Sequence, residues 1–260
     1  MKRIFITISI VLCAMNWAAA QEKDLLTTNN GTVIVPQQGS FAFGVDATPV
    51  LKYVGGLFSD NGATTPVFTY AGFYGKYFLA DNLALRGKLR LGYNSNTDVS
   101  LVPETGNVDK MVENKTTTSN MDISLSVGIE KRIGATRLQG FFGGEATFGT
   151  GFSNNINRTY GNPLSSVNSG PRQLSSKAGT AFFVGAAVFT GVEYFIAPGI
   201  AIGGELGWGI VYSSKGRGEQ KTESWNVTSQ KIDTITVETG GESSFKFDNF
   251  DGSFTLTFYF

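Results

Sequence analysis

Eight stretches of this chain alternate apolar and polar residues with a period of two, the spacing of a β-strand that has one apolar face. In the clearest stretch, residues 83–93, leucines dominate one face, whereas Arg86, Lys88 and Arg90 share the other. The stretches lie at about 40–54, 66–79, 83–93, 121–130, 137–148, 182–194, 200–212 and 245–260. In the last one the apolar residues move from odd to even positions, which predicts a β-bulge within 248–252. A chain built from such segments is expected to be all-β.

The connections between these stretches alternate between tight and long. Residues 80–82, 134–136 and 197–199 form tight turns rich in turn-forming residues. The long connections, dominated by Asn, Ser, Thr, Gly and charged residues, lie near 55–65, 94–118, 153–178 and 213–243. Short turns at one end and long loops at the other are typical of transmembrane barrels. We therefore predict an eight-stranded antiparallel transmembrane β-barrel with short periplasmic turns and long extracellular loops.

Strand length and aromatic positions fit a barrel that crosses a membrane. The ten steps from Leu83 to Tyr93 cover roughly 33 Å, which spans roughly 25 Å of bilayer when the strand is tilted by about 40°. Aromatic residues fall at both rims of this band, as an interfacial girdle requires: Tyr77, Tyr93, Phe148, Phe182, Tyr194 and Tyr212. The alternative is a soluble barrel of the lipocalin kind, which points its apolar face inward.

The first 20 residues have the features of a cleavable secretory signal. Two basic residues precede an apolar core at 4–13, and small residues at 18–20 form the cleavage site. The alternative is a lipoprotein signal acylated at Cys13, although Leu12 is bulky where such motifs carry a small residue. Cys13 is the only cysteine, so cleavage would leave a chain without disulfide or thiol chemistry. The predicted organisation is a signal at 1–20, a polar periplasmic leader at 21–38 and the barrel at 39–260.

The C-terminal strand carries the most specific pattern. Its apolar face is formed by Phe254, Leu256, Phe258 and Phe260. Together with the secretory signal, this pattern resembles the C-terminal signature by which outer-membrane barrels of Gram-negative bacteria are recognised for assembly. Residues 39–260 as a whole are similar in architecture to the small OmpA/OmpX-like outer-membrane barrels. The resemblance implies a location in the cell outer membrane and contact with its lipid and with the barrel-assembly machinery. Unlike family members with a peptidoglycan-binding tail, the chain is expected to have no periplasmic domain after Phe260.

Charged residues of both signs lie on the faces that would point into the barrel: Asp46, Lys76, Arg86, Lys88, Arg90, Asp122, Glu130, Arg137, Glu145, Glu193 and Glu205. An eight-stranded barrel is just wide enough for side chains to fill it, so these charges would meet each other. Because buried ions are costly unless they are paired, we expect a salt-bridged plug that closes the lumen. The alternative is a narrow polar path along a wall of inward glycines, namely Gly185, Gly191, Gly203, Gly207 and Gly209. A catalytic carboxylate pair of the glycosidase type is also conceivable, but no polysaccharide would reach it in a closed lumen.

Composition argues against several other functions. The chain has no histidine, so the usual acid–base group near neutral pH is missing, and we expect no enzyme. Basic and acidic residues are balanced at 21 each, and loss of Lys2 and Arg3 with the signal would leave a net charge of −2. This charge is no footprint for nucleic acid. No cofactor or metal site is indicated.

The long connections are the expected recognition surface, because they face outward on a rigid scaffold. In the last one, residues 232–237 read as a strand that would protrude beyond the membrane with an adhesive edge. The alternative is a solvated loop or an ordinary extension of a hairpin. We interpret the chain as a structural or surface-interaction protein with a largely closed lumen, whose partner is an extracellular ligand or another outer-membrane protein. Two alternatives remain open: a narrow channel for small solutes, and an accessory subunit that docks onto a larger complex through lipid-facing Gly140, Gly144 and Gly204.

Overall fold

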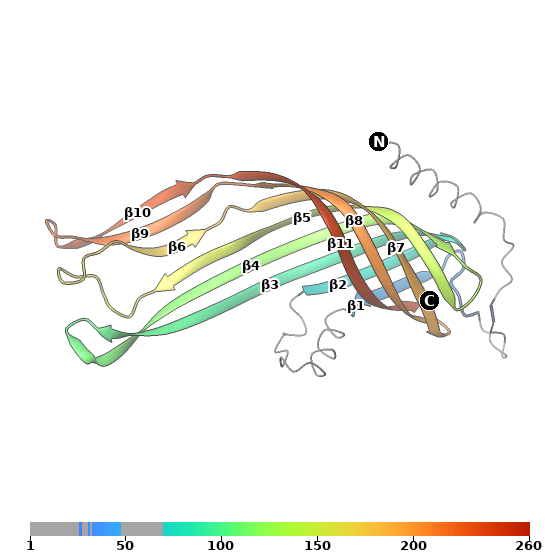
Figure 1. The fold of residues 1–260 in the computed structure, drawn as a ribbon, viewed down its shortest axis with the longest axis horizontal. Helices are drawn as coiled ribbons and strands as arrows, with labels where there is room; N and C mark the ends of the chain where they lie inside the picture. The colour runs from blue at the N-terminus through green and yellow to red at the C-terminus, as the bar shows by residue number, and fades with distance from the viewer. Residues whose placement is uncertain (1–25, 28–30, 32, 48–69) are drawn as a thin grey trace.

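Eight antiparallel strands close into a barrel in the computed structural model of the chain, which describes residues 26–27, 31, 33–47 and 70–260 (Figure 1). The ring consists of β1 (Phe41–Asp46), β2 (Tyr70–Ala80), β3 (Leu83–Glu104), β4 (Asn107–Ile133), β5 (Leu138–Thr159), β7 (Ala181–Ala197), β8 (Ile200–Lys215) and β11 (Glu242–Tyr259). It closes because β11 pairs with β1, and β5 pairs with β7. The predicted eight-stranded antiparallel barrel is confirmed.

None of the described residues belongs to a helix that is long and apolar enough to cross a membrane.

The two faces of the barrel wall differ as the alternation predicts. On the outer face Leu125 is 51% exposed, and on the inner face Arg86 is only 2% exposed. Polar side chains therefore fill the lumen and apolar side chains cover the outside, which is the reverse of a soluble barrel of the lipocalin kind. The outward aromatic side chains of the predicted girdle, Tyr77, Tyr93, Phe148, Phe182, Tyr194 and Tyr212, are all exposed.

The tight turns join β2 to β3, β4 to β5, and β7 to β8, as predicted. Gly134 and Gly199 adopt φ angles of 115° and 72° in two of these turns, a region of backbone conformation that favours glycine. The register of β11 against β8 shifts between Asn249 and Asp251, so the predicted bulge in the last strand is also present.

The predicted long loops at 94–118, 153–178 and 213–243 are wrong in one respect, because much of their length is strand, and the one at 55–65 lies outside the described residues. β3 and β4 stay paired as far as Glu104 and Asn107. Three further strands, β6 (Arg172–Lys177), β9 (Gly218–Asn226) and β10 (Lys231–Thr239), complete the eleven found among the described residues. Polar sequences can form strands whose two faces are both solvated when hydroxyl and β-branched side chains pair across the ladder, as Thr97 and Thr117 do at 2.9 Å.

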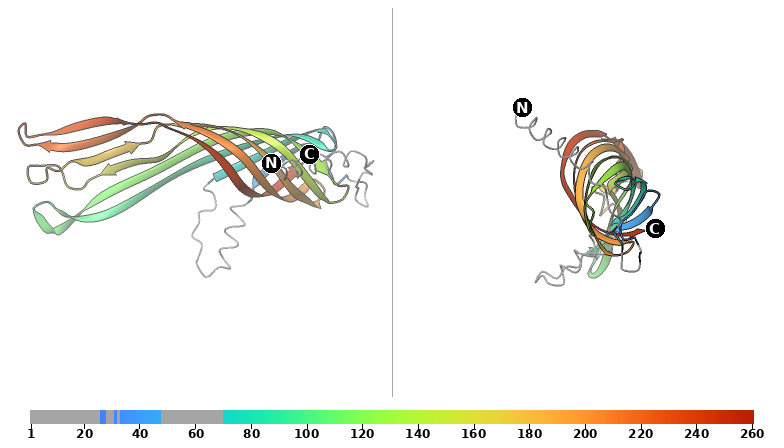
Figure 2. Two further views of the ribbon diagram at one scale, coloured as in Figure 1. Left: turned by 45° about the horizontal axis from the view of Figure 1, so that its top comes forward. Right: turned by 90° about the vertical axis from the view of Figure 1, so that its right-hand side faces the viewer.

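These strands form a sheet that continues the barrel wall on its loop side. Its order is β10, β9, β6, β5, β4, β3. Figure 2 shows this extension projecting along the barrel axis, well beyond the ring. We refer to residues 94–118, 154–177 and 218–239 as the extracellular sheet.

The segment before β1 packs under the turn end of the barrel. Ile34 and Val35 are buried there against Phe195 and Ala201, and Leu26 and Tyr259 pack on the same cluster. The segment predicted as a polar leader therefore contributes apolar contacts to the barrel. The predicted signal, and the parts of the first two predicted strands that fall within 48–69, lie outside the described residues.

Candidate functional site

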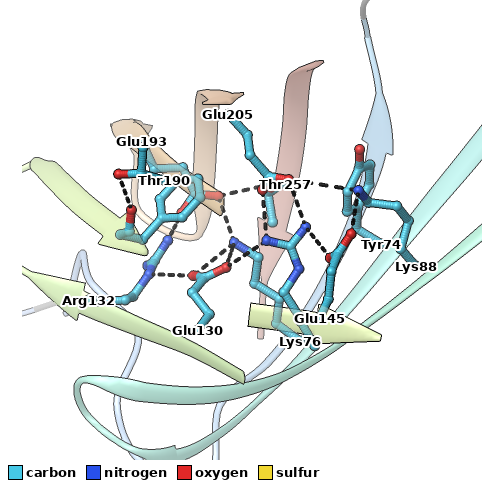
Figure 3. A network of polar contacts seen from close by, with 12 residues as sticks. Tyr74, Lys76, Lys88, Glu130, Arg132, Glu145, Thr190, Glu193, Glu205 and Thr257 are labelled. Atoms are coloured by element: carbon cyan, nitrogen blue, oxygen red, sulfur yellow. Dashed lines mark hydrogen bonds and ion pairs between the residues drawn. The ribbon is translucent and has the colours of Figure 1, made fainter. Parts of the chain in front are cut away.

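The lumen holds four cations and four carboxylates at the level of the turn-side half of the barrel, a group that we call the plug: Lys76, Arg86, Lys88, Arg132, Glu130, Glu145, Glu193 and Glu205. Inward alternation on β2, β3, β4, β5, β7 and β8 brings these side chains to one region. Each is at most 13% exposed. Figure 3 shows their polar contacts as one connected network.

The turn-side layer of the plug is centred on Lys76 and Arg132. The Lys76 ammonium lies 3.0 Å from Glu130 and 3.1 Å from Glu193. The Arg132 guanidinium donates to Glu130 at 3.0 Å and to Gln139 at 3.1 Å, and it also pairs with Glu193. Two cations and two carboxylates therefore neutralise one another in this layer.

The layer above is centred on Arg86. Its guanidinium donates two hydrogen bonds to Glu205, at 2.7 and 3.1 Å, in the bidentate geometry that suits arginine and carboxylate. The same guanidinium lies 3.6 Å from Glu130 and 3.5 Å from Glu145, so it links the two layers. Lys88 completes the upper layer at 3.4 Å from Glu145 and 3.7 Å from Glu205.

Aromatic rings pack against the ions of the plug. The Arg86 guanidinium lies 4.0 Å from the centre of the Phe189 ring, and the Lys76 ammonium lies 5.0 Å from that of Phe141. Tyr259 connects the plug to the apolar cluster below it: its hydroxyl donates to Glu193 at 2.5 Å and accepts from Arg132 at 2.9 Å. The cation–π contacts of Arg86 and Lys76 are favourable because both cations are buried.

Next to the plug, phenylalanine rings from one strand occupy the space beside inward-facing glycines of the neighbouring strand. On the β5–β7 ladder, Phe141 lies opposite Gly191, and Phe189 lies opposite Gly143. A Cβ built at Gly191 overlaps the Phe141 ring, and one built at Gly143 lies 2.5 Å from the Phe189 ring. The room expected at Gly191 is thus taken by an aromatic side chain.

A cavity of about 570 Å³ lies above the plug, on the loop side of the lumen. Lys88, Glu145 and Glu205 form its floor, and Arg90 and Asp122 belong to its wall. Hydroxyl side chains and glycines line it together with apolar and aromatic residues, including Ser124, Ser126, Thr147, Gly185, Phe183 and Phe189. The lumen is therefore hollow on the loop side and packed on the turn side.

Residues 60–236 match the family model that describes the OmpA-OmpF-like porin family. The chain belongs to this family. Its barrel is accordingly that of an outer-membrane protein. No curated protein matches the chain. Among solved structures, the outer membrane protein OprG from Pseudomonas aeruginosa is similar, with 10% sequence identity, a TM-score of 0.39, and coverage of 87% of this chain and 98% of that one.

Not every charge predicted to face the lumen of this porin-family barrel joins the plug. Arg90 and Asp122 lie higher, in the cavity wall, and Asp46 lies beside Gly72 at the end of β1. Arg137 is a correction: it precedes β5 at the turn-end rim, where its guanidinium donates to the backbone oxygens of Phe195 and Ile196. The Arg137 side chain therefore lies at the rim and does not join the plug, although its position in the alternation is inward.

The alternation did not reveal Arg132, a member of the turn-side layer, or Tyr259, whose hydroxyl hydrogen-bonds to Arg132 and Glu193. Arg132 is two residues after Glu130 and shares its face, so extending the fourth stretch to Ile133 would have found it. Tyr259 lies between two outward phenylalanines, Phe258 and Phe260, in a strand that was considered only for its lipid-facing side.

The C-terminal strand closes the barrel by pairing with the first strand. Phe260 exchanges two backbone hydrogen bonds with Phe41, at 2.8 and 3.0 Å, which join β11 to the start of β1. Of the predicted assembly-signal residues, Phe258 and Phe260 are exposed on the outer face, and Phe254 and Leu256 are half-buried. Within the described part of the chain, no three Asp, Glu, His or Cys side chains are grouped to hold a metal ion.

Proposed function

We propose that this porin-family protein is a closed barrel that anchors the extracellular sheet rigidly at the cell surface, where the sheet acts as an interaction surface. The observation that carries this proposal is the balanced plug. Its four cations and four carboxylates pair across the lumen, and aromatic rings pack around them. Opening a water path would require breaking several buried ion pairs together, each of which is costly to disrupt.

The extracellular sheet has the contacts of a folded platform. Arg172 on β6 donates to Glu223 on β9 at 2.7 Å and to the backbone oxygen of Asn162 at 2.6 Å. Its guanidinium also lies 4.5 Å from the centre of the Tyr160 ring. These contacts bind the β5–β6 connection to the β9–β10 hairpin, so the platform is ordered before any partner arrives. Such preorganisation lowers the entropic cost of binding.

Planar-bilayer recording of the refolded barrel tests whether the lumen is closed. The unmodified protein should give no steady ion steps. The double variant Arg86→Ala with Glu205→Ala removes the central pair and leaves room in the plug, and it should conduct. Arg217→Ala is the matched control outside the barrel and should stay silent. Steady conductance in the unmodified protein would contradict the closed barrel.

A second candidate function, a narrow channel for small solutes, is favoured by the cavity above the plug. Charged and hydroxyl side chains form part of its lining, and it lies on the loop side, where a solute would enter. If the channel is correct, the unmodified protein conducts, and Lys88→Ala changes the conductance or the ion selectivity because Lys88 lies at the cavity floor. The same recordings therefore separate the two candidates.

Removal of the β9–β10 hairpin tests the role of the extracellular sheet. Replacing residues 218–239 by a short turn should leave the barrel folded, as shown by its heat-dependent migration on gels. The shortened protein should no longer bind the surfaces that the unmodified protein binds. Retention of all such contacts by the shortened protein would contradict an interaction surface in this hairpin.

A further inference from the structure

β10 forms an open edge of the extracellular sheet. All nine of its residues pair with β9, from Lys231 opposite Asn226 to Thr239 opposite Gly218. On its other side, β10 has no strand partner among the described residues. Eight of its nine side chains are exposed, including Ile235 at 59%. A row of backbone N–H and C=O groups is thus available for another strand.

The sequence of β10 favours strand pairing. It contains no proline or glycine, and six of its nine residues are isoleucine, valine or threonine. The opposite edge of the extracellular sheet, formed by the outer half of β3, carries Pro103 and a register shift at the same place. Proline and bulges are the usual protection of an edge strand, and β10 has neither.

The acidic residues of β10 do not protect its edge either, because they are engaged within the hairpin. Asp233 accepts a hydrogen bond from the Asn226 amide at 2.7 Å, and Glu238 accepts one from Arg217 at 3.2 Å. Between them lies the uncharged run Thr234, Ile235, Thr236 and Val237. The central part of the edge therefore presents no free charge to an approaching strand.

We propose that β10 pairs with β10 of a second copy of this chain, antiparallel and centred on Ile235. In this register Ile235 faces its own equivalent, Thr234 faces Thr236, and Asp233 faces Val237. The remaining pairs are Ile232 with Glu238 and Lys231 with Thr239. No two like charges lie opposite each other, and the central pairs combine β-branched side chains, which stabilise antiparallel ladders.

The direction of β10 determines where the two copies lie. β10 runs along the long axis of the molecule, from the outer end of the hairpin back toward the barrel (Figures 1 and 2). Antiparallel pairing therefore places the two barrels at opposite ends of the dimer. The copies belong to two facing membranes, so the pairing joins one membrane surface to another. This inference rests on the proposed function, for which it names the partner.

Charge substitutions at Ile235 test the pairing directly. Full-length mature protein is reconstituted in two vesicle populations with different fluorescent lipids, and vesicle pairing is counted. Unmodified protein should pair the vesicles. Ile235→Lys on both populations should abolish pairing through repulsion across the two-fold axis, and so should Ile235→Glu on both. Ile235→Lys on one population and Ile235→Glu on the other should restore it.

Val108→Lys and Val108→Glu are the matched controls, because Val108 is 78% exposed near the tip of the β3–β4 hairpin, away from β10. They should leave pairing unchanged. Ile235→Cys gives a second measurement: the rest of the predicted mature chain has no cysteine, so a disulfide between differently tagged copies from the two populations reports the two-fold contact alone.

The outcomes separate this inference from the proposed function. If the Ile235 variants pair vesicles like the unmodified protein, while deletion of 218–239 abolishes pairing, the hairpin is an interaction surface but β10 self-pairing is refuted. If unmodified vesicles do not pair and Ile235→Cys gives no dimer, self-pairing is also refuted. The ion recordings and the binding of other surfaces by the hairpin then decide the proposed function independently.

Discussion

Arg86 on β3 and Glu205 on β8 are joined by two hydrogen bonds, of 2.7 and 3.1 Å, across the full width of the barrel. The two strands lie four places apart in a ring of eight, so the pair spans the lumen diametrically. Lys76 on β2 and Glu193 on β7 make a second diametric pair at 3.1 Å. Such pairs connect opposite walls directly, in addition to the ladders that connect neighbours.

Arg86→Ala should destabilise the barrel by about 3–5 kcal/mol, because it leaves Glu205 and its neighbours buried without their central cation. Urea unfolding of the refolded protein in detergent, followed by tryptophan fluorescence, would measure the loss. Arg217→Ala is the control: it removes the exposed ion pair with Glu238 and should not shift the midpoint measurably. Equal shifts in both variants would show that the plug does not hold the barrel together.

Gly191→Ala should cost about 1–3 kcal/mol, because the added methyl group overlaps both the Phe141 ring and the backbone oxygen of Gly204. Gly204→Ala on the adjacent strand is a matched control, since its Cβ meets nothing within 4 Å on the outer face. The same unfolding titration compares the two variants. A tolerated Gly191→Ala would mean that the phenylalanine rings in the lumen are free to move aside.

Tyr259→Phe and Phe260→Ala should separate stability from assembly in neighbouring residues. Loss of the Tyr259 hydroxyl removes a hydrogen bond from both Glu193 and Arg132, and should cost about 1–3 kcal/mol of unfolding free energy. Phe260 is exposed, so Phe260→Ala should leave the unfolding midpoint unchanged. If the terminal strand is an assembly signal, Phe260→Ala instead lowers the amount of heat-modifiable protein in the outer membrane. If Tyr259→Phe instead lowered assembly and Phe260→Ala lowered stability, the two roles would have to be exchanged.

Arg172→Ala should loosen the extracellular sheet without affecting the barrel. The substitution removes the contacts that tie β6 to β9 and to the loop at Asn162. Amide hydrogen exchange should become faster in β6, β9 and β10, and remain unchanged in β7 and β8. Unchanged exchange in β9 would show that the backbone ladder alone orders the platform, and faster exchange throughout would show that platform and barrel are coupled.

Much of the barrel could be predicted because alternation is a local property. Residues 83–93 place their leucines on one face and Arg86, Lys88 and Arg90 on the other, whatever the neighbouring strands are. The tight turns and the bulge in β11 were visible for the same reason. Of the extracellular strands, only β10 was indicated by the sequence, through the strand-like run at 232–237. The others were missed because polar sequences with two solvated faces have no apolar alternation to reveal them, and β6 is recognisable only from its pairing with β5 and β9.

The sequence by itself determined which side chains share a face within each strand, because successive side chains along a strand point to opposite faces. Only the tertiary structure decided that Arg86 pairs with Glu205, that Arg90 and Asp122 line a cavity instead of joining the plug, and that β9 pairs with β6. These contacts depend on the register and curvature of all eight strands together, since a small shift between any two of them moves opposite walls relative to each other.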